Sequence, residues 1–197
     1  MWSQDLPFRV AFGVLFFTLA AIVVRFRRAA QRGRQFDYAA EGRRMFVALR
    51  AGGLALWGYC LLYVVYPGAL TWSFVAMPDG LRWMGAVVAA ATVPLVTAAQ
   101  RAIGRNVSPT VTTHDDHELV TTGPYRWVRH PLYTAGTAIF TGLGLLASSW
   151  FLLLSAAVAL VLVTVRLPHE EARLEARFGQ RYRDYAASTG RFLPRWF

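Results

Sequence analysis

Four long apolar stretches, separated by polar and arginine-rich segments, organise the 197-residue chain. The first three, residues 6–24, 46–66 and 81–99, are dominated by Ala, Val, Leu, Phe and Trp. A helix that rises about 1.5 Å per residue needs about 20 residues to cross about 30 Å of hydrocarbon. Each of these stretches has that length, so the pattern predicts three membrane-spanning helices.

The fourth apolar stretch, residues 131–166, is too long for a single span. The sequence Ser148-Ser149-Trp150 interrupts it with polar and aromatic side chains that are typical of a membrane interface. We therefore predict a tight hairpin of two short helices, at residues 131–147 and 150–167. The whole chain is predicted to be one all-α membrane domain, residues 1–197, with five transmembrane helices.

The composition and the distribution of charge extend this picture. Hydrophobic residues make up 55% of the chain and charged residues only 16%, which is too apolar for an ordinary soluble domain. All 21 basic residues are arginines, and 19 of them flank or lie in the first connection, the third-to-fourth span connection and the C-terminal tail, which leaves Arg9 and Arg82. Since cytoplasmic segments carry the basic excess, we expect a multi-pass protein of the inner (plasma) membrane, with its N-terminus outside and its C-terminus in the cytoplasm.

The net charge of +10 raises the question of a partner. A nucleic-acid footprint is disfavoured, because the arginines are spread over three juxtamembrane segments without a recognition motif. Anionic membrane lipids are the expected counter-charge. No protein partner can be inferred, and the all-arginine usage with short loops points to a bacterial source.

The connection after the third span, residues 100–130, is longer than a helix hairpin needs, and long ordered loops are often functional. Its end places Arg129 and His130 directly before a predicted helix. Pro131 suits the first turn of that helix, where its missing N–H would be unpaired anyway. The free N–H groups of the helix start, together with Arg129 and His130, predict an anion pocket at the membrane surface.

Two adjacent carboxylates, Glu170 and Glu171, follow the fifth predicted span. At a membrane boundary they should meet cations or hydroxyl groups, because a desolvated carboxylate without partners is costly. Beyond them, apolar and aromatic residues recur at spacings of four, four and three: Leu174, Phe178, Tyr182 and Tyr185. This face predicts a cytosolic amphipathic helix. It can fold back over the loop and cover a pocket or lie on the bilayer, and the pattern alone favours the bilayer.

These two segments together resemble the isoprenylcysteine carboxyl methyltransferase family. The resemblance rests on an ordered set of residues: Gly123-Pro124-Tyr125-Arg126-Trp127-Val128-Arg129-His130-Pro131-Leu132-Tyr133, Gly136, Glu170-Glu171, Leu174, Phe178-Gly179, Tyr182, Tyr185, Arg191 and Pro194. It covers residues 119–194 and implies an integral membrane enzyme that takes a methyl group from S-adenosylmethionine. The cofactor is then expected on the cytosolic side, held by the Arg-His-Pro loop, the last two spans and the Glu-Glu tail. The resemblance also implies that this chain lacks the soluble methyltransferase fold, which agrees with the absence of any predicted strand followed by a glycine-rich turn.

The chemistry of these residues suits that cofactor. Arg129, His130 and the helix that begins at Pro131 can bind its carboxylate, and Glu170 or Glu171 can bind its ammonium group or ribose hydroxyls. Aromatic side chains can flank the adenine and the sulfonium: Tyr133, Phe178, Tyr182 and Tyr185. Gly136 is included among the candidate site residues because it belongs to the family motif. Because neighbouring residues on a helix point about 100° apart, one glutamate can face the cofactor while the other pairs with an arginine.

The need for a base depends on the methyl acceptor. A carboxylate or thiolate acceptor requires alignment and exclusion of water, whereas a neutral thiol or amine also requires proton removal. His130 or Tyr125 can serve as the base, with Arg129 in the same candidate catalytic loop, and a purely anchoring role for these residues stays open. The acceptor is expected to be a lipophilic or small carboxylate, thiol or amine, with lipophilic acceptors entering from the bilayer.

No metal site is predicted. The mixed run His114-Asp115-Asp116-His117 lacks the regular spacing of converging ligands and is interpreted as a solvated polar loop. His169, beside Glu170, is interpreted in the same way.

Two other functions are considered. Membrane sterol reductases resemble this C-terminal region, pairing a loop like residues 130–133 with an acidic, aromatic tail that binds NADPH. The Glu170-Glu171 pair and the short chain favour the methyltransferase. A non-enzymatic membrane protein is the third alternative, and an ion pathway is disfavoured because ionisable residues are lacking deep in the predicted spans.

Overall fold

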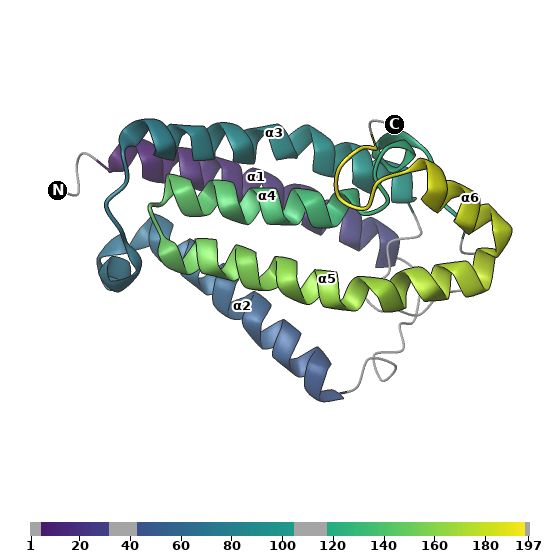
Figure 1. The fold of residues 1–197 in the computed structure, drawn as a ribbon. Coiled ribbons are helices and arrows are strands. Elements are labelled where there is room, and N and C mark those ends of the chain that lie inside the picture. The colour runs from purple at the N-terminus through teal and green to yellow at the C-terminus, as the bar shows by residue number, and fades with distance from the viewer. Residues whose placement is uncertain (1–4, 32–42, 105–117, 196–197) are drawn as a thin grey trace.

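The computed structural model describes residues 5–31, 43–104 and 118–195, and all five predicted spans form helices within them (Figure 1). The long helices are α1 (Leu6–Gln31), α2 (Arg43–Val65), α3 (Asp79–Ile103), α4 (Pro131–Leu146) and α5 (Trp150–Phe178). Shorter helices are η2 (Pro67–Ser73), η4 (Gly123–Arg126) and α6 (Gln180–Ser188). Within these three described ranges there is no strand, so the predicted all-α class is confirmed.

The helices differ in their capacity to cross a membrane. Three are long and apolar enough: α1 over Leu6–Phe26, α3 over Asp79–Ile103 and α5 over Trp150–Phe178. The second, α2, qualifies only together with η2, and the two helices meet at an angle of 119°. With 16 residues, α4 is apolar but shorter than a usual span. By length and composition, the described residues therefore contain three or four candidate spans.

The last long helix continues beyond its predicted end at residue 167. It includes Pro168 and both glutamates and ends at Phe178. Proline removes one backbone donor, but a helix supported by its neighbours tolerates that loss. The preceding residue, Leu167, is only 1% exposed and fixes this part of α5 against the bundle.

The predicted amphipathic helix is divided in two by Gly179. This glycine adopts φ +55°, a conformation that costs glycine little, and its N–H donates to the carbonyl of Glu175. Phe178 is therefore the last residue of α5, whereas Tyr182 lies on α6. The prediction that these residues form one face of a single helix is wrong, because the chain changes direction at Gly179, between α5 and α6.

Helices α1, α3 and α4 lie side by side, α5 runs along α4, and α2 diverges from the others toward its own N-terminus (Figure 1). The α3–α4 contact is close because both helices carry a glycine there. A Cβ atom on Gly142 would lie 2.7 Å from the carbonyl oxygen of Gly85 and 2.8 Å from the backbone nitrogen of Ala89. The two backbones therefore touch directly.

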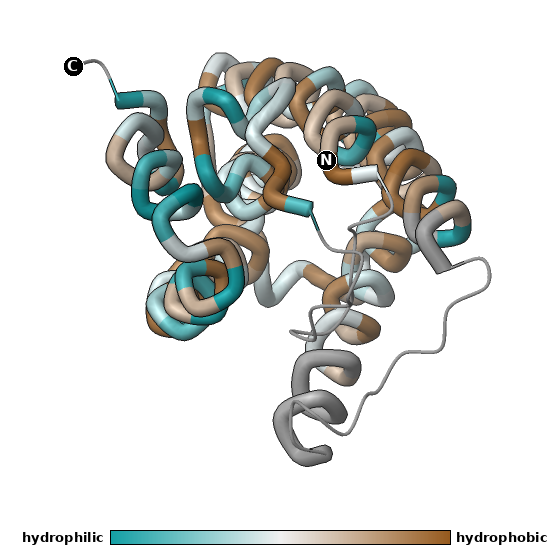
Figure 2. Tube along the Cα trace, turned by 90° about the vertical axis from the view of Figure 1, so that its right-hand side faces the viewer, coloured by the Kyte–Doolittle hydropathy of each residue, from teal (hydrophilic) through white to brown (hydrophobic). Residues whose placement is uncertain are grey.

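Polar contacts close the end of the bundle where α1 and α3 begin. The hydroxyl of Tyr59 lies 2.6 Å from the hydroxyl of Ser73 and 2.6 Å from that of Ser149, which joins α2, η2 and α5. Arg82 forms an ion pair with Asp5 at 2.7 Å. Hydrophilic residues gather at the opposite end, around the C-terminus (Figure 2). That end carries the predicted functional residues.

Candidate active site

The Arg-His-Pro loop is bound along its backbone by residues 189–192, which we call the C-terminal strap. The N–H of Arg129 donates to the carbonyl of Gly190 at 2.8 Å. The next N–H, that of His130, donates to the carbonyl of Arg191 at 3.1 Å. Pairing of the two segments through the main chain fixes the loop immediately before α4.

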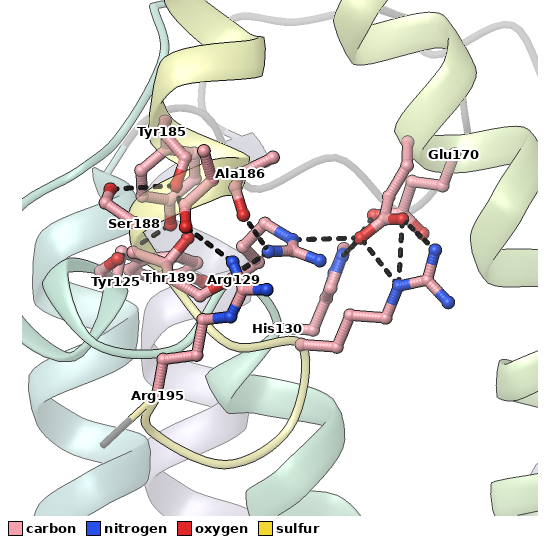
Figure 3. Close-up of polar contacts among 12 residues, drawn as sticks. Tyr125, Arg129, His130, Glu170, Tyr185, Ala186, Ser188, Thr189 and Arg195 are labelled. Atoms are coloured by element: carbon pink, nitrogen blue, oxygen red, sulfur yellow. Dashed lines mark hydrogen bonds and ion pairs between the residues drawn. The ribbon is translucent and has the colours of Figure 1, made fainter. Parts of the chain in front are cut away.

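The Arg129 side chain joins three elements (Figure 3). Its Nε donates to Glu171 on α5 at 3.0 Å, and its Nη1 donates to the carbonyls of Ala186 on α6, at 2.8 Å, and of Thr189. The side chain is only 11% exposed. A planar guanidinium with several fixed donors suits such a junction. The segment after Gly179 thus lies against the loop rather than on the bilayer alone.

Glu171 is the most heavily engaged carboxylate of the site. Arg191 approaches it with Nη2 at 2.6 Å, and His130 Nε2 lies 3.4 Å from Oε1, the oxygen that also accepts from Arg129. Its side chain is 13% exposed. Two arginines therefore compensate a carboxylate that has lost most of its water.

Glu170, one residue earlier, has a different environment. Its Oε2 accepts a hydrogen bond from the Tyr133 hydroxyl at 2.9 Å, and its Oε1 lies 4.0 Å from His130 Nδ1. The side chain is 29% exposed, more than twice the value for Glu171. The carboxylate of Glu170 is thus the more accessible of the two.

His130 lies between the two carboxylates. It is 6% exposed, and its ring stacks on Tyr133 with the ring centroids 5.6 Å apart. Burial lowers the pKa of His130 below its ordinary value, although Glu170 and Glu171 oppose the shift. The imidazole is therefore neutral at pH 7 and able to accept a proton.

Three further tyrosines surround this cluster. Tyr185 donates from its hydroxyl to the backbone carbonyl of Tyr125 at 2.7 Å, which ties α6 to η4. Burial raises the pKa of Tyr185 to about 12 and also raises the pKa of Tyr125 and of Tyr182. All three phenols are therefore protonated at neutral pH.

The structure thus brings most of the predicted site residues into one polar cluster: Tyr125, Arg129, His130, Tyr133, Glu170, Glu171, Tyr182 and Tyr185. Pro131 and Gly136 lie in the first two turns of α4, Phe178 is the last residue of α5, and none of the three contributes a polar side-chain atom.

One important group, Arg191, was not predicted as a site residue, although it belongs to the family pattern. The signal that could have identified it was the expectation that two adjacent carboxylates at a membrane boundary meet a cation. Thr134 is a second such residue, because its hydroxyl donates to the carbonyl of Phe192 in the strap at 2.8 Å.

The residues considered as metal ligands, His114, Asp115, Asp116 and His117, lie outside the described residues. Within residues 5–31, 43–104 and 118–195, no group of three or more His, Cys, Asp or Glu side chains is placed to hold a metal ion. His169 is exposed on α5.

Comparison with solved structures defines the class of fold. The eukaryotic intramembrane Ras methyltransferase ICMT (isoprenylcysteine carboxyl methyltransferase) matches with a TM-score of 0.60. The match covers 95% of this chain and 67% of that chain, at 20% sequence identity. The chain therefore has the fold of an intramembrane methyltransferase.

The family follows from the sequence comparison. The family model for phospholipid methyltransferases matches residues 81–181, which is just over half of the chain. The chain belongs to this family of membrane methyltransferases. The matched residues contain the Arg-His-Pro loop and both glutamates, whereas Tyr182, Tyr185 and the C-terminal strap lie beyond them.

A curated relative is similar over a shorter region. The nickel-cobalt-cadmium resistance protein NccN of Alcaligenes xylosoxydans xylosoxydans is 40% identical over 78 residues. These residues are 40% of this chain and 37% of the relative, so the match spans little more than a third of that protein.

Proposed function

We propose that this protein is an S-adenosylmethionine-dependent membrane methyltransferase that binds its methyl donor between the Arg-His-Pro loop, α5 and α6. The observation that carries the proposal is the cluster of His130, Tyr133 and Glu170 in a chain with an intramembrane methyltransferase fold. When bound, adenosylmethionine supplies an electrophilic methyl group. The residues of the chain bind, align and shield it.

The two glutamates have separate roles in this proposal. Glu170 is the more exposed carboxylate and accepts a hydrogen bond from the Tyr133 phenol, so it binds the ammonium group or a ribose hydroxyl of the donor. Glu171 is engaged by Arg129 and Arg191 and holds the strap in place.

The remaining contacts follow from charge and shape. Arg129 and the first turn of α4, which begins at Pro131, supply positive potential for the carboxylate of the donor. Aromatic rings flank the adenine and the cationic sulfur: Tyr133, Phe178, Tyr182 and Tyr185. Gly136 leaves room on α4, because a Cβ atom there would have no neighbour within 4 Å.

His130 is proposed as the base for an acceptor that must lose a proton. Its neutral imidazole accepts the proton from a thiol or amine, and the resulting imidazolium is stabilised by Glu170 and Glu171. Tyr125 is protonated at pH 7 and orients the acceptor instead. A carboxylate acceptor would need alignment alone, so loss of His130 would affect it less.

We further propose five membrane spans, an amphipathic tail at the cytoplasmic surface and a lipophilic or small acceptor in a bacterial inner membrane. The charge pattern supports this orientation, because 19 of the 21 arginines flank or lie in the two predicted cytoplasmic connections and the C-terminal tail. A reporter fused after Phe197 is expected to be active only in the cytoplasm. Activity only on the outer side would contradict this orientation.

Ligand binding tests the function directly. Purified protein in detergent should retain tritiated adenosylmethionine saturably, and NADPH should not compete. Retention of NADPH instead would support a reductase, and retention of neither would support a non-enzymatic protein. Incubating membranes with labelled adenosylmethionine, followed by mass spectrometry of the labelled product, would then identify the acceptor.

A further inference from the structure

The tyrosines of the candidate active site differ in what their hydroxyl groups contact. Tyr133 donates to Glu170, and Tyr185 donates to the carbonyl of Tyr125. Tyr182 is only 4% exposed, and its hydroxyl has no hydrogen-bond partner among the described residues. The Tyr182 hydroxyl is therefore a polar group of this cluster that is buried without a hydrogen-bond partner among the described residues.

Such a group is costly, because it gives up hydrogen bonds to water and gains none from protein. The described part of the chain has three other buried side-chain atoms of this kind, on Arg9, Gln100 and Ser148. Arg9 and Ser148 lie on α1 and at the α4–α5 turn, and Gln100 lies near the end of α3 that contacts η4, so none of the three is a residue of the polar cluster defined above. The Tyr182 hydroxyl therefore stands out by its position.

The surroundings of Tyr182 place its hydroxyl at the cluster. It lies in the first turn of α6, and its ring centroid is 6.2 Å from that of Tyr185. The charges of Glu171, Arg129 and Glu170 act on the hydroxyl. Figure 3 shows Tyr185, Thr189 and Arg129 close to one another. Since the phenol is protonated at neutral pH, it is a ready hydrogen-bond donor.

We propose that the hydroxyl of Tyr182 donates a hydrogen bond to the bound methyl donor, adenosylmethionine. This inference rests on the proposed function and adds a specific contact to it, beyond the aromatic packing expected from the sequence. The hydroxyl of Tyr185 has a structural role instead, because it already donates to the carbonyl of Tyr125 and so holds α6 against η4.

A matched pair of variants, Tyr182→Phe and Tyr185→Phe, separates the two roles. Each is measured for its thermal unfolding midpoint in detergent without ligand and for its dissociation constant for tritiated adenosylmethionine. Tyr182→Phe should unfold at the same or a higher temperature than the wild type, because it removes an unpaired buried hydroxyl. Its dissociation constant should rise about tenfold, the effect of one lost hydrogen bond. Tyr185→Phe should unfold at a lower temperature, because the Tyr125 carbonyl loses its donor.

Two results would overturn the proposal while leaving the methyltransferase function intact. One is an unchanged dissociation constant in Tyr182→Phe while the wild type binds normally. The other is a lower unfolding midpoint of ligand-free Tyr182→Phe, which would show that the hydroxyl has a structural partner. Absence of binding by the wild type would instead overturn the proposed function, and the hydrogen bond with it.

Discussion

Arg191 contacts both carboxylate oxygens of Glu171, a residue 20 positions earlier in the chain. Its Nη2 lies 2.6 Å from Oε2, and its Nε lies 3.0 Å from Oε2 and 3.3 Å from Oε1. Glu171 is largely shielded, whereas the Arg191 side chain is 50% exposed. The pair therefore fastens the C-terminal strap to α5 from the solvent side.

Replacing this arginine should loosen the strap. For Arg191→Ala we expect a loss of about 1 kcal/mol in the free energy of unfolding, since the arginine is half-exposed and Arg129 still compensates Glu171. Trypsin should cleave the tail faster, and adenosylmethionine should slow that cleavage. The control is Arg183→Ala, which removes an ion pair with Glu175 in which both side chains are about half exposed. Equal trypsin sensitivity of the two variants would contradict a specific fastening.

The glutamates should respond differently to loss of charge. Glu171→Gln leaves the shielded Arg129 without its carboxylate and should lower the free energy of unfolding by about 2 kcal/mol. Glu170→Gln should fold nearly as stably as the wild type but bind adenosylmethionine about 10- to 100-fold more weakly. Thermal unfolding and equilibrium binding measure the two effects. The assignment fails if Glu170→Gln is the less stable variant and binds normally.

His130 should make the stability of the protein depend on pH. Its pKa in the folded state is lowered, so between the ordinary value of about 6.5 and the lowered value the unfolded chain binds more protons. The contribution of the neutral His130 to the free energy of unfolding is therefore fully present above about pH 6.5, and it is lost as the pH falls from there toward the lowered pKa. The groups that face the imidazole are Glu170, Glu171 and Arg129, and the two carboxylates limit the loss.

Unfolding midpoints at pH 7.5 and pH 6.0 measure this effect. The wild type should lose more stability between these values than His130→Gln. The exposed His169 provides the control, since His169→Gln should keep the dependence of the wild type. If the unfolding midpoint of His130→Gln depended on pH as strongly as that of the wild type, the effect would belong to another group.

Close packing of α3 on α4 should depend on Gly142. An added methyl group would overlap the backbone of Gly85 and Ala89, so Gly142→Ala should lower the free energy of unfolding by about 1–3 kcal/mol. Gly58 on α2 has open space around its Cβ position, and Gly58→Ala should be neutral or stabilising by up to about 1 kcal/mol. Thermal unfolding in detergent compares them, and equal midpoints would contradict the close contact.

The sequence predicted the long helices because a membrane span needs a continuous apolar run of fixed length. Their ends were less well predicted. Arg25 and Arg28 lie inside α1 and Pro168 lies inside α5, because arginine is a good helix former and packing around Leu167 offsets the missing proline donor. A polar or helix-breaking residue therefore did not mark the end of either helix.

The residues that the structure brings together in the candidate site could be predicted where one short motif contains both a helix start and charged or aromatic side chains, as in Arg129-His130-Pro131 with Tyr133. The strap was not predicted, because its contacts with the backbone of the loop are made by the carbonyl groups of Gly190 and Arg191, and every residue type offers a carbonyl. No side-chain pattern marks such a partner. The division at Gly179 was missed because the apolar spacing continues across it.

The shortness of α4 has a consequence for where the chemistry takes place. Its 16 residues span about 24 Å, against about 30 Å of hydrocarbon. At its far end, Trp150 donates from its indole to the carbonyl of Trp72, and both rings are partly exposed, as in an interfacial anchor. If α4 spans the membrane as proposed and that end lies at one surface, the shortfall of about 6 Å places His130 beneath the other surface, or thins the bilayer above it. The lipophilic acceptor proposed above would then meet the imidazole while its apolar part stays among the lipids.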